Sequence, residues 1–401
     1  MNGIKNITMY HIYDSRGSST VECQITTSNG IVSSIAPGGA STGKKEVASF
    51  PNGGVDSSLS IFNSKIKKEM LQWEFGKQKE FDKFLHELDG TENLSNIGGA
   101  MTTVLSLSYA KASAIEESVP LYEYIRRLTG TKLSIPYVLG NVMNGGRHAV
   151  GGPDIQEYLS LAMGKSARES VEANYMVHKV IMEKLKEKGM KAIGKGDEGG
   201  WVTSLGNIQA LEVLSESCNY VREQGFEVYP ALDLAASQFY NNGLYRYREQ
   251  TVDGDGQVSY MVDLADKYNI KLIEDPFDED DFDHFAQLTE KIGNKTVIVG
   301  DDLYTTSTER LKKGIGKGST NAVLVKVNQI GTLSDTIEFI KLATMHKYKN
   351  IVSHRSGESC DNAIAHLAVG CGAYAIKTGV MGGERVAKLN ELIKIDENRS
   401  M

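Results

Sequence analysis

The chain has 401 residues, of which 40% are hydrophobic and 24% charged, so it is long enough for two globular domains. Its formal net charge of −7 argues against a nucleic-acid-binding surface, because phosphate recognition needs concentrated Lys and Arg. The sequence starts without the apolar core of a signal peptide, and no run approaches a membrane span, so we expect a cytoplasmic protein with no membrane partner.

Alternating apolar residues open the chain and predict three antiparallel strands, over residues 4–13, 20–27 and 31–35. Helical patterns follow over about 59–88, 100–117 and 121–128, and Gly130 marks the end of the last helix. We therefore expect an N-terminal α+β domain over residues 1–130.

A glycine-bearing loop at residues 38–43 follows the third strand. It is close to the phosphate-binding P-loop pattern, but Lys45 stands where that motif needs Ser or Thr, and an antiparallel meander precedes it. A mobile loop that closes over a phosphorylated ligand fits better, with Ser41 and Thr42 supplying oxygens.

The second part of the chain has the pattern of a barrel. Strand-like runs at 137–143 and 155–163 and helical patterns at about 167–188 and 207–224 precede six strand–helix units. Two and six strands make eight, which predicts an α/β fold with a TIM-like barrel over residues 131–401. Each of the six later strands ends on an ionisable residue: Asp233, Glu274, Asp301, Lys326, His354 and Lys377.

The carboxyl ends of parallel barrel strands meet at one rim, so we expect these side chains to converge. A single acid at a strand end is commonly a helix cap or an ion-pair partner. Three converging acids, Asp233, Glu274 and Asp301, would repel one another without a cation, so the pattern predicts a Mg²⁺-type site.

Lys326 and Lys377 follow apolar strands, where burial beside metal charge is expected to lower the pKa of an amine toward the range of a general base. The alternative is a lysine that extends its stem to the barrel mouth and keeps its charge in water.

Three further segments carry candidate site residues, although each could be turn chemistry alone. Glu198 lies in a loop of small residues, and a like-charged neighbour such as Glu157 would help to hold a proton on one of the two carboxyls. Arg355 follows His354 and precedes Ser356, and its guanidinium is suited to forked contact with phosphate.

These residues lie within motifs through which nearly the whole chain resembles the enolase (phosphopyruvate hydratase) family. The motifs include Asp14-Ser-Arg-Gly17, Gly39-Ala-Ser-Thr-Gly43, Gly196-Asp-Glu-Gly-Gly200, Ile273-Glu-Asp-Pro-Phe277, Leu324-Val-Lys-Val-Asn-Gln329 and Ser353-His-Arg-Ser-Gly357. The resemblance implies a ββαα(βα)6 barrel behind an N-terminal capping domain. It also implies a lyase of glycolysis and gluconeogenesis that reversibly dehydrates 2-phosphoglycerate to phosphoenolpyruvate with two Mg²⁺ ions.

The resemblance also implies a role for each candidate residue. Lys326 would be the base, Glu198 the acid that assists hydroxide departure, and Glu157 its support. The first Mg²⁺ would be bound by Asp233, Glu274 and Asp301, and the second by Ser41 with the substrate phosphate. Substrate binding would fall to His148, Gln156, His354, Arg355, Ser356, Lys377 and Ser41. The family further suggests a homo-oligomer, a dimer or higher.

The sequence departs from the family pattern at Gly38, where Ser is usual, at Ser18-Ser19 and at residues 380–383, and it is shorter over about 49–77. These departures leave two alternatives open. One is a paralogue that abstracts an α-proton from another carboxylate, and the other is a non-catalytic surface binding protein.

Overall fold

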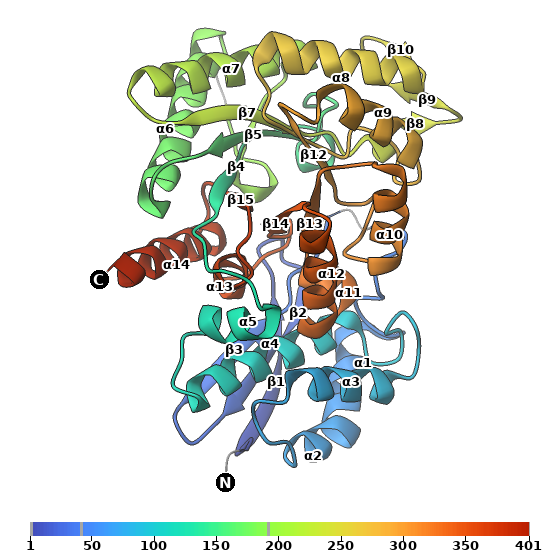
Figure 1. Ribbon diagram of the computed structural model, residues 1–401, viewed down its shortest axis with the longest axis vertical. Coiled ribbons are helices and arrows are strands. Elements are labelled where there is room, and N and C mark those ends of the chain that lie inside the picture. The colour runs from blue at the N-terminus through green and yellow to red at the C-terminus, as the bar shows by residue number, and fades with distance from the viewer. Residues whose placement is uncertain (1–2, 41–42, 191–192, 401) are drawn as a thin grey trace.

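An antiparallel meander of three strands opens the chain, as the alternating pattern predicted. The computed structural model describes residues 3–40, 43–190 and 193–400 (Figure 1). The strands pair in chain order, with Asn6 opposite Thr26 and Thr26 opposite Ile31. Their bounds are β1 (Asn6–Tyr13), β2 (Ser19–Thr26) and β3 (Ile31–Ile35).

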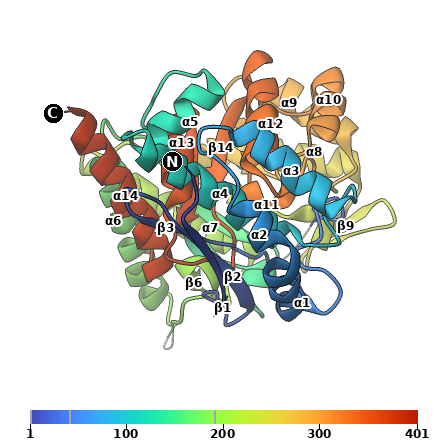
Figure 2. The ribbon, with the colours of Figure 1, turned by 90° about the horizontal axis from the view of Figure 1, so that it is seen from below.

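Helices cover the meander and complete the N-terminal lobe, which lies at the bottom of Figure 1 and faces the viewer in Figure 2. The predicted helical run over 59–88 is interrupted: a turn separates Met70 from Gln78, where Gly76 has a φ of +88° and Trp73 O accepts a bond from Ile4 N. The helices are α1 (Gly54–Ile61), α2 (Lys67–Met70), α3 (Gln78–Asp89), α4 (Gly99–Glu116) and α5 (Leu121–Thr129), with a π-helical turn at Phe62–Ile66.

Eight strands form a closed barrel in the rest of the chain, which confirms the predicted fold class. β5 runs antiparallel to both of its neighbours, β4 and β7, and the last strand pairs in parallel with the first, Lys377 lying opposite Leu139. The barrel strands are β4 (Tyr137–Asn144), β5 (Glu157–Ala162), β7 (Val228–Asp233), β11 (Leu272–Glu274), β12 (Val297–Gly300), β13 (Ala322–Val325), β14 (Lys349–Ser353) and β15 (Ala375–Gly379).

Helices surround the barrel in the order ββαα(βα)6 (Figure 1). They are α6 (Ala167–Glu187), α7 (Asn207–Glu223), α8 (Gly254–Tyr268), α9 (Phe282–Ile292), α10 (Thr308–Lys317), α12 (Leu333–Met345), α13 (Ala363–Gly370) and α14 (Gly383–Ser400), with the short α11 (Val327–Ile330) after β13. Four short strands were not predicted from the sequence: β6 (Trp201–Val202), β8 (Tyr240–Asn241), β9 (Leu244–Arg246) and β10 (Thr251–Val252).

The period-2 alternation of the barrel strands decides which side chains reach the interior. Leu272, Val299 and Leu324 belong to an apolar cluster inside the barrel, whereas the next residues on β11 and β13, Ile273 and Val325, pack under the helices. An ionisable side chain lies two residues after each of these three interior residues. The alternation therefore directs Glu274, Asp301 and Lys326 into the mouth of the barrel, as it does Asp233 after Ala231 and Lys377 after Ala375.

The N-terminal lobe sits against this rim. α4 contacts β2 and β3 on one side and α11 and α12 on the other, which explains why it is buried on nearly every face. Gly38 and Gly357 exchange two backbone hydrogen bonds of 2.8 and 2.7 Å, and Lys111 Nζ lies 2.8 Å from Asp361 Oδ2. These contacts place the segment that follows β3 beside the catalytic end of the barrel.

In the described part of the chain, none of the helices combines the length and the apolar character needed to cross a membrane.

Candidate active site

One pocket at the carboxyl ends of the barrel strands gathers nearly all of the predicted site residues. Glu274 lies immediately beside it, fully buried and in contact with Lys377. Ser41, predicted to bind substrate and metal, lies outside the described residues, as does Thr42. The pocket is lined by His148, Gln156, Glu157, Glu198, Asp233, Asp301, Lys326, Ser353, His354, Arg355, Ser356 and Lys377.

Lys377 lies at the centre of a ring of buried carboxylates. Its Nζ is 3.0 Å from Glu157 Oε2, 3.0 Å from Asp233 Oδ2 and 2.8 Å from Glu274 Oε2. Burial lowers the pKa of Lys377, but these carboxylates more than offset it, so the net pKa lies well above the ordinary lysine value. The ammonium is therefore charged among these protein groups, and the lowered pKa expected beside a bound metal ion stays a prediction.

Lys326, which follows β13, contacts the Asp301 carboxylate through its Nζ. Burial again lowers the pKa of Lys326, but Asp301 and further carboxylates such as Glu274 together raise it by more, so the net pKa is above the ordinary lysine value. The carboxylate partner stabilises the charged form of the amine, and the lowered pKa expected beside metal charge stays a prediction here as well.

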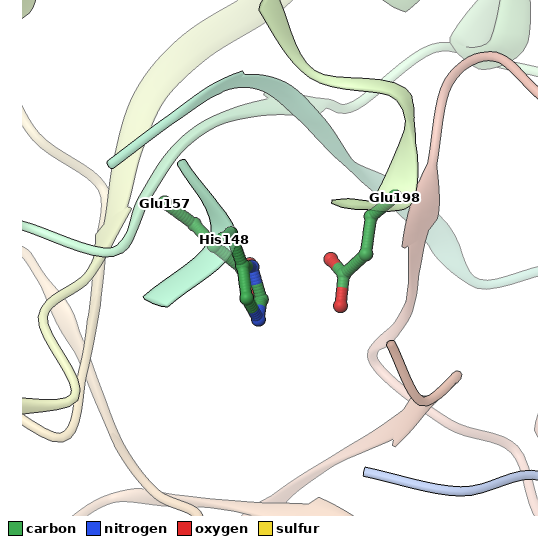
Figure 3. Close-up of side chains that lie close together, drawn as sticks. All are labelled: His148, Glu157 and Glu198. Carbon is green, nitrogen blue, oxygen red and sulfur yellow. The ribbon is translucent and has the colours of Figure 1, made fainter. Parts of the chain in front are cut away.

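Glu157, His148 and Glu198 face one another across the pocket (Figure 3). His148 follows β4, Glu157 begins β5, and Glu198 lies in a 3₁₀ turn with a φ of +64°. His148 Nδ1 lies 3.3 Å from Glu157 Oε1, and Glu198 Oε2 accepts a 3.0 Å bond from Asn141 Nδ2. Left-handed backbone is uncommon for glutamate, so the turn holds this carboxylate at a local conformational cost.

The two carboxyls differ in protonation. Burial and the negative charge of Glu198 hold the pKa of Glu157 well above its usual range. Burial also raises the pKa of Glu198. The neighbouring His354 and His148 lower this pKa by more, so the net pKa of Glu198 lies below the usual range. The two pKa values are thus shifted in opposite directions, so Glu157 retains a proton more readily than Glu198, which is the effect expected of a like-charged neighbour.

Arg355 is buried and its guanidinium already has protein partners. Nη1 donates to Glu46 Oε2 at 3.1 Å and to Asn328 Oδ1 at 2.9 Å, and Nη2 donates to Glu46 Oε1 at 3.1 Å. Ser356 Oγ accepts a 3.2 Å bond from Ala40 N. The residues expected to bind phosphate are therefore tied directly to the segment around the predicted mobile loop.

Gln156 is buried, and a hydrogen bond orients its side-chain amide: Oε1 accepts a 2.7 Å bond from Gln238 Nε2. The amide therefore has one oriented partner before any ligand binds.

The rim carries more buried carboxylates than cations, which suits a hard divalent cation with oxygen ligands. Asp233 and Glu274 are cross-strand neighbours, whereas Asp301 contacts Lys326 and accepts a 3.0 Å bond from Gln329 Nε2. Among the described residues, ligand atoms within 4.8 Å of one another occur in two acidic groupings: His148, Glu157 and Glu198, and Asp275, Asp301 and Asp302. The predicted acidic trio does not form such a grouping, but its donor chemistry fits Mg²⁺.

Several residues at the site were missed from the sequence. Asp275 and Asp302 stand next to predicted acids, and the doubled acids Glu274-Asp275 and Asp301-Asp302 were a usable signal. Burial and Asp301 raise the pKa of Asp302 to about 7. Glu46, Asn141 and Arg385 gave no such signal, because their partners are far away in the sequence.

Comparison with known proteins agrees with this geometry. The family model described as "Enolase, N-terminal domain" matches residues 4–125, and "Enolase, C-terminal TIM barrel domain" matches residues 132–400. The chain is 45% identical to an enolase of Thermoplasma acidophilum over 396 residues, 98% of each chain. It is 46% identical to an enolase of Methanothermobacter thermautotrophicus over 402 residues, 98% of this chain and 96% of the relative.

An enolase of Natronomonas pharaonis is 43% identical over 403 residues, 99% of this chain and all of the relative. These relatives have nearly the same length as the chain, so its shortness over residues 49–77 does not set it apart from them. With both family models matched in order and identity sustained over nearly the full length, the chain belongs to the enolase family.

Proposed function

We propose that this enzyme, a lyase, reversibly dehydrates 2-phosphoglycerate to phosphoenolpyruvate in glycolysis and gluconeogenesis. One observation carries the proposal: a single pocket is lined by two lysines, a pair of buried carboxyls and a buried arginine. These are the groups needed to remove a proton from carbon, to assist a leaving hydroxide and to bind a phosphate.

Lys326 is the proposed base for the C2 proton. In the deprotonated state its Nζ has the lone pair needed to accept that proton, and the Asp301 carboxylate then stabilises the resulting ammonium. The same contact holds the amine in place before the reaction, which is the larger part of the advantage of a fixed catalytic group.

Glu198 is the proposed acid at the C3 hydroxyl, with Glu157 supporting it. The raised pKa of Glu157 favours its protonated form, and His148 Nδ1 lies 3.3 Å from that carboxyl. Loss of hydroxide requires one proton to form water, and the carboxyl pair can supply it. Both carboxyls are then ionised, and the charged Lys377 Nζ, 3.0 Å from Glu157 Oε2, offsets the second negative charge.

The substrate anions meet the cationic side of the pocket. Arg355 and Ser356 would bind the phosphate, and Lys377 would bind the carboxylate, because its ammonium is charged and directed into the mouth of the barrel. His148, Gln156 and His354 line the same pocket and would exclude water from it. Ser41 would join the phosphate from the loop of residues 38–43.

Two Mg²⁺ ions complete the proposed site, one bound by Asp233, Glu274 and Asp301 and one by Ser41 with the substrate phosphate. When bound, they would supply positive charge opposite the substrate carboxylate, where removal of the C2 proton adds negative charge. The excess of buried carboxylates at the rim supports their presence.

The shared pocket also weighs against the two alternatives. Arg355 and Ser356 line the same space as Lys326, which favours a phosphorylated hydroxy acid over other carboxylates. A surface binding role gives no reason for burying so many charged groups in one cavity, since burial of charge is costly.

The proposal includes a lobe of residues 1–130 that caps a barrel of residues 131–401, a cytoplasmic location and a homo-oligomer without nucleic-acid or membrane partners. Sedimentation of the purified protein measures the assembly, and cell fractionation measures the location.

The decisive experiment is an assay that follows phosphoenolpyruvate formation from 2-phosphoglycerate with Mg²⁺ present. A panel of unphosphorylated hydroxy acids tests the paralogue alternative. Folded protein that forms no phosphoenolpyruvate from 2-phosphoglycerate would refute the proposal.

A further inference from the structure

Arg385, in the first turn of α14, is a buried arginine that directs its guanidinium at the residues following β14. It is 1% exposed. Nη1 lies 2.8 Å from His354 Nδ1 and donates to Arg355 O at 2.6 Å, while Nη2 donates to Ser356 O at 2.5 Å. Burying a guanidinium costs several kcal/mol, and three acceptors on one catalytic segment offset that cost.

These contacts determine which nitrogen of His354 carries the hydrogen. Arginine can only donate, so Nδ1 of His354 must accept, and Gly379 N donates to the same atom at 3.3 Å. The ring hydrogen therefore lies on Nε2, which is 3.0 Å from Glu198 Oε2. The Glu198 carboxylate thus lies beside Nε2 of His354, and its Oε2 also accepts a bond from Asn141 Nδ2.

Charged residues lie near His354 on each element that packs against it. Glu198 lies at Nε2 and Arg385 at Nδ1, and Glu358 follows in the same loop as His354. Lys377, on β15, accepts the backbone N–H of His354 through its own carbonyl. Lys388 is 2.8 Å from Glu358 and neutralises it. Burial holds the pKa of His354 down at about 4, with Glu198 opposing and Arg385 adding to the effect.

We propose that Arg385 is a positioning residue that keeps His354 neutral with its hydrogen on Nε2, so that His354 donates to Glu198 and fixes that carboxylate for proton transfer. The consequence for turnover rests on the proposed function, whereas the state of the imidazole does not. Without the guanidinium, Nδ1 would be free to take a proton, or the hydrogen could move to Nδ1 and leave two acceptors, Nε2 and Glu198 Oε2, facing each other.

The first test observes the imidazole directly. Long-range ¹H–¹⁵N correlation spectra of the full chain, labelled with ¹⁵N-histidine and recorded at neutral pH, distinguish the two ring tautomers, and His354→Gln assigns the signal. We expect Nε2 protonated and Nδ1 unprotonated. A hydrogen on Nδ1, alone or with Nε2, would overturn the inference.

The second test uses Arg385→Gln and Arg385→Lys, with Arg399→Gln as the matched control, an exposed arginine on the same helix. For Arg385→Gln we expect kcat to fall about 10- to 100-fold with little change in KM. We also expect the acid limb of its pH profile to move to higher pH, because His354 then takes a proton more readily. Arg385→Lys should restore part of kcat.

A folded Arg385→Gln enzyme with the kcat and pH profile of the parent would refute the positioning role. If Arg385→Gln does not fold, two other measurements test the positioning role. They are the kcat of Arg385→Lys relative to the parent and the histidine spectrum of the parent. Parent enzyme that forms no phosphoenolpyruvate would refute the proposed function, and the spectrum would still test the state of His354.

Discussion

The Lys326 ammonium contacts the Asp301 carboxylate, so the proposed base and a proposed metal ligand are held together across neighbouring strands. The contact has two consequences: it positions the amine, and it couples the charge of the base to whatever else Asp301 binds. Three predictions concern the charged residues of the proposed site, and a fourth concerns the buried Asp82 of α3.

Lys326→Ala should lower kcat for phosphoenolpyruvate formation by at least about 10²- to 10⁴-fold, because the group that accepts the C2 proton is gone. Circular dichroism should show an unchanged fold. The matched control is Lys349→Ala, at the other end of the barrel, where β14 begins. An active Lys326→Ala enzyme would exclude Lys326 as the base.

Glu198→Gln should separate the two halves of the reaction. The variant loses the acid at C3 but keeps Lys326, so exchange of the C2 hydrogen of 2-phosphoglycerate with solvent deuterium should continue while dehydration falls by about 10²-fold or more. Proton NMR measures the exchange, and Glu290→Gln on the exposed face of α9 serves as the control. Loss of both activities together would contradict the assignment of separate roles.

Removal of Mg²⁺ by a chelator should abolish turnover, and added Mg²⁺ should restore it. Glu274→Gln should weaken Mg²⁺ binding measured by calorimetry, since it removes one proposed ligand charge. In the parent, Mg²⁺ at 100 times its Kd should raise the free energy of unfolding by about 2.7 kcal/mol. Full activity after exhaustive chelation would contradict a metal-dependent reaction.

Asp82 on α3 should make stability depend on pH. Burial raises the pKa of Asp82 to about 6, although Ser334 N and Gln78 Nε2 donate to it. The folded pKa exceeds the unfolded value of about 3.9, so the stabilisation is present below about pH 4 and is lost as the pH rises through about 6. The loss should be about 3 kcal/mol.

Asp82→Asn cannot ionise, so its free energy of unfolding should change less between about pH 4 and 7 than that of the parent. Urea unfolding across this range measures the difference, with Asp266→Asn on the exposed face of α8 as the control. Equal pH dependence in parent and variant would show that Asp82 does not carry the effect.

Much of the fold could be predicted from the sequence because strand alternation and helical periodicity are local signals. The same alternation that marks Leu272 and Leu324 as interior residues also directs Glu274 and Lys326 to the barrel mouth. The break in the run over 59–88 and strands of two or three residues, such as β8 and β9, are too short to leave a periodic pattern.

The charges at the site were harder to anticipate, because they depend on partners distant in the sequence. Arg355 is matched with Glu46, and Lys377 with Glu157, at separations that no local pattern records. The sequence indicated that both lysines are buried but not which carboxylates face them, and these carboxylates raise the pKa of both amines. The direction of each shift required the three-dimensional arrangement.

The pairing of β15 with β4 also constrains how the molecule is made. The first barrel strand begins at Tyr137, and the strand that pairs with it begins at Ala375. The barrel can therefore close only after the ribosome has synthesised both strands and the residues between them. Contacts between such distant segments slow folding, because chain closure comes before any gain from them. Since Lys377 lies on that last strand, a nascent polypeptide gains its reaction centre only once this strand has been synthesised.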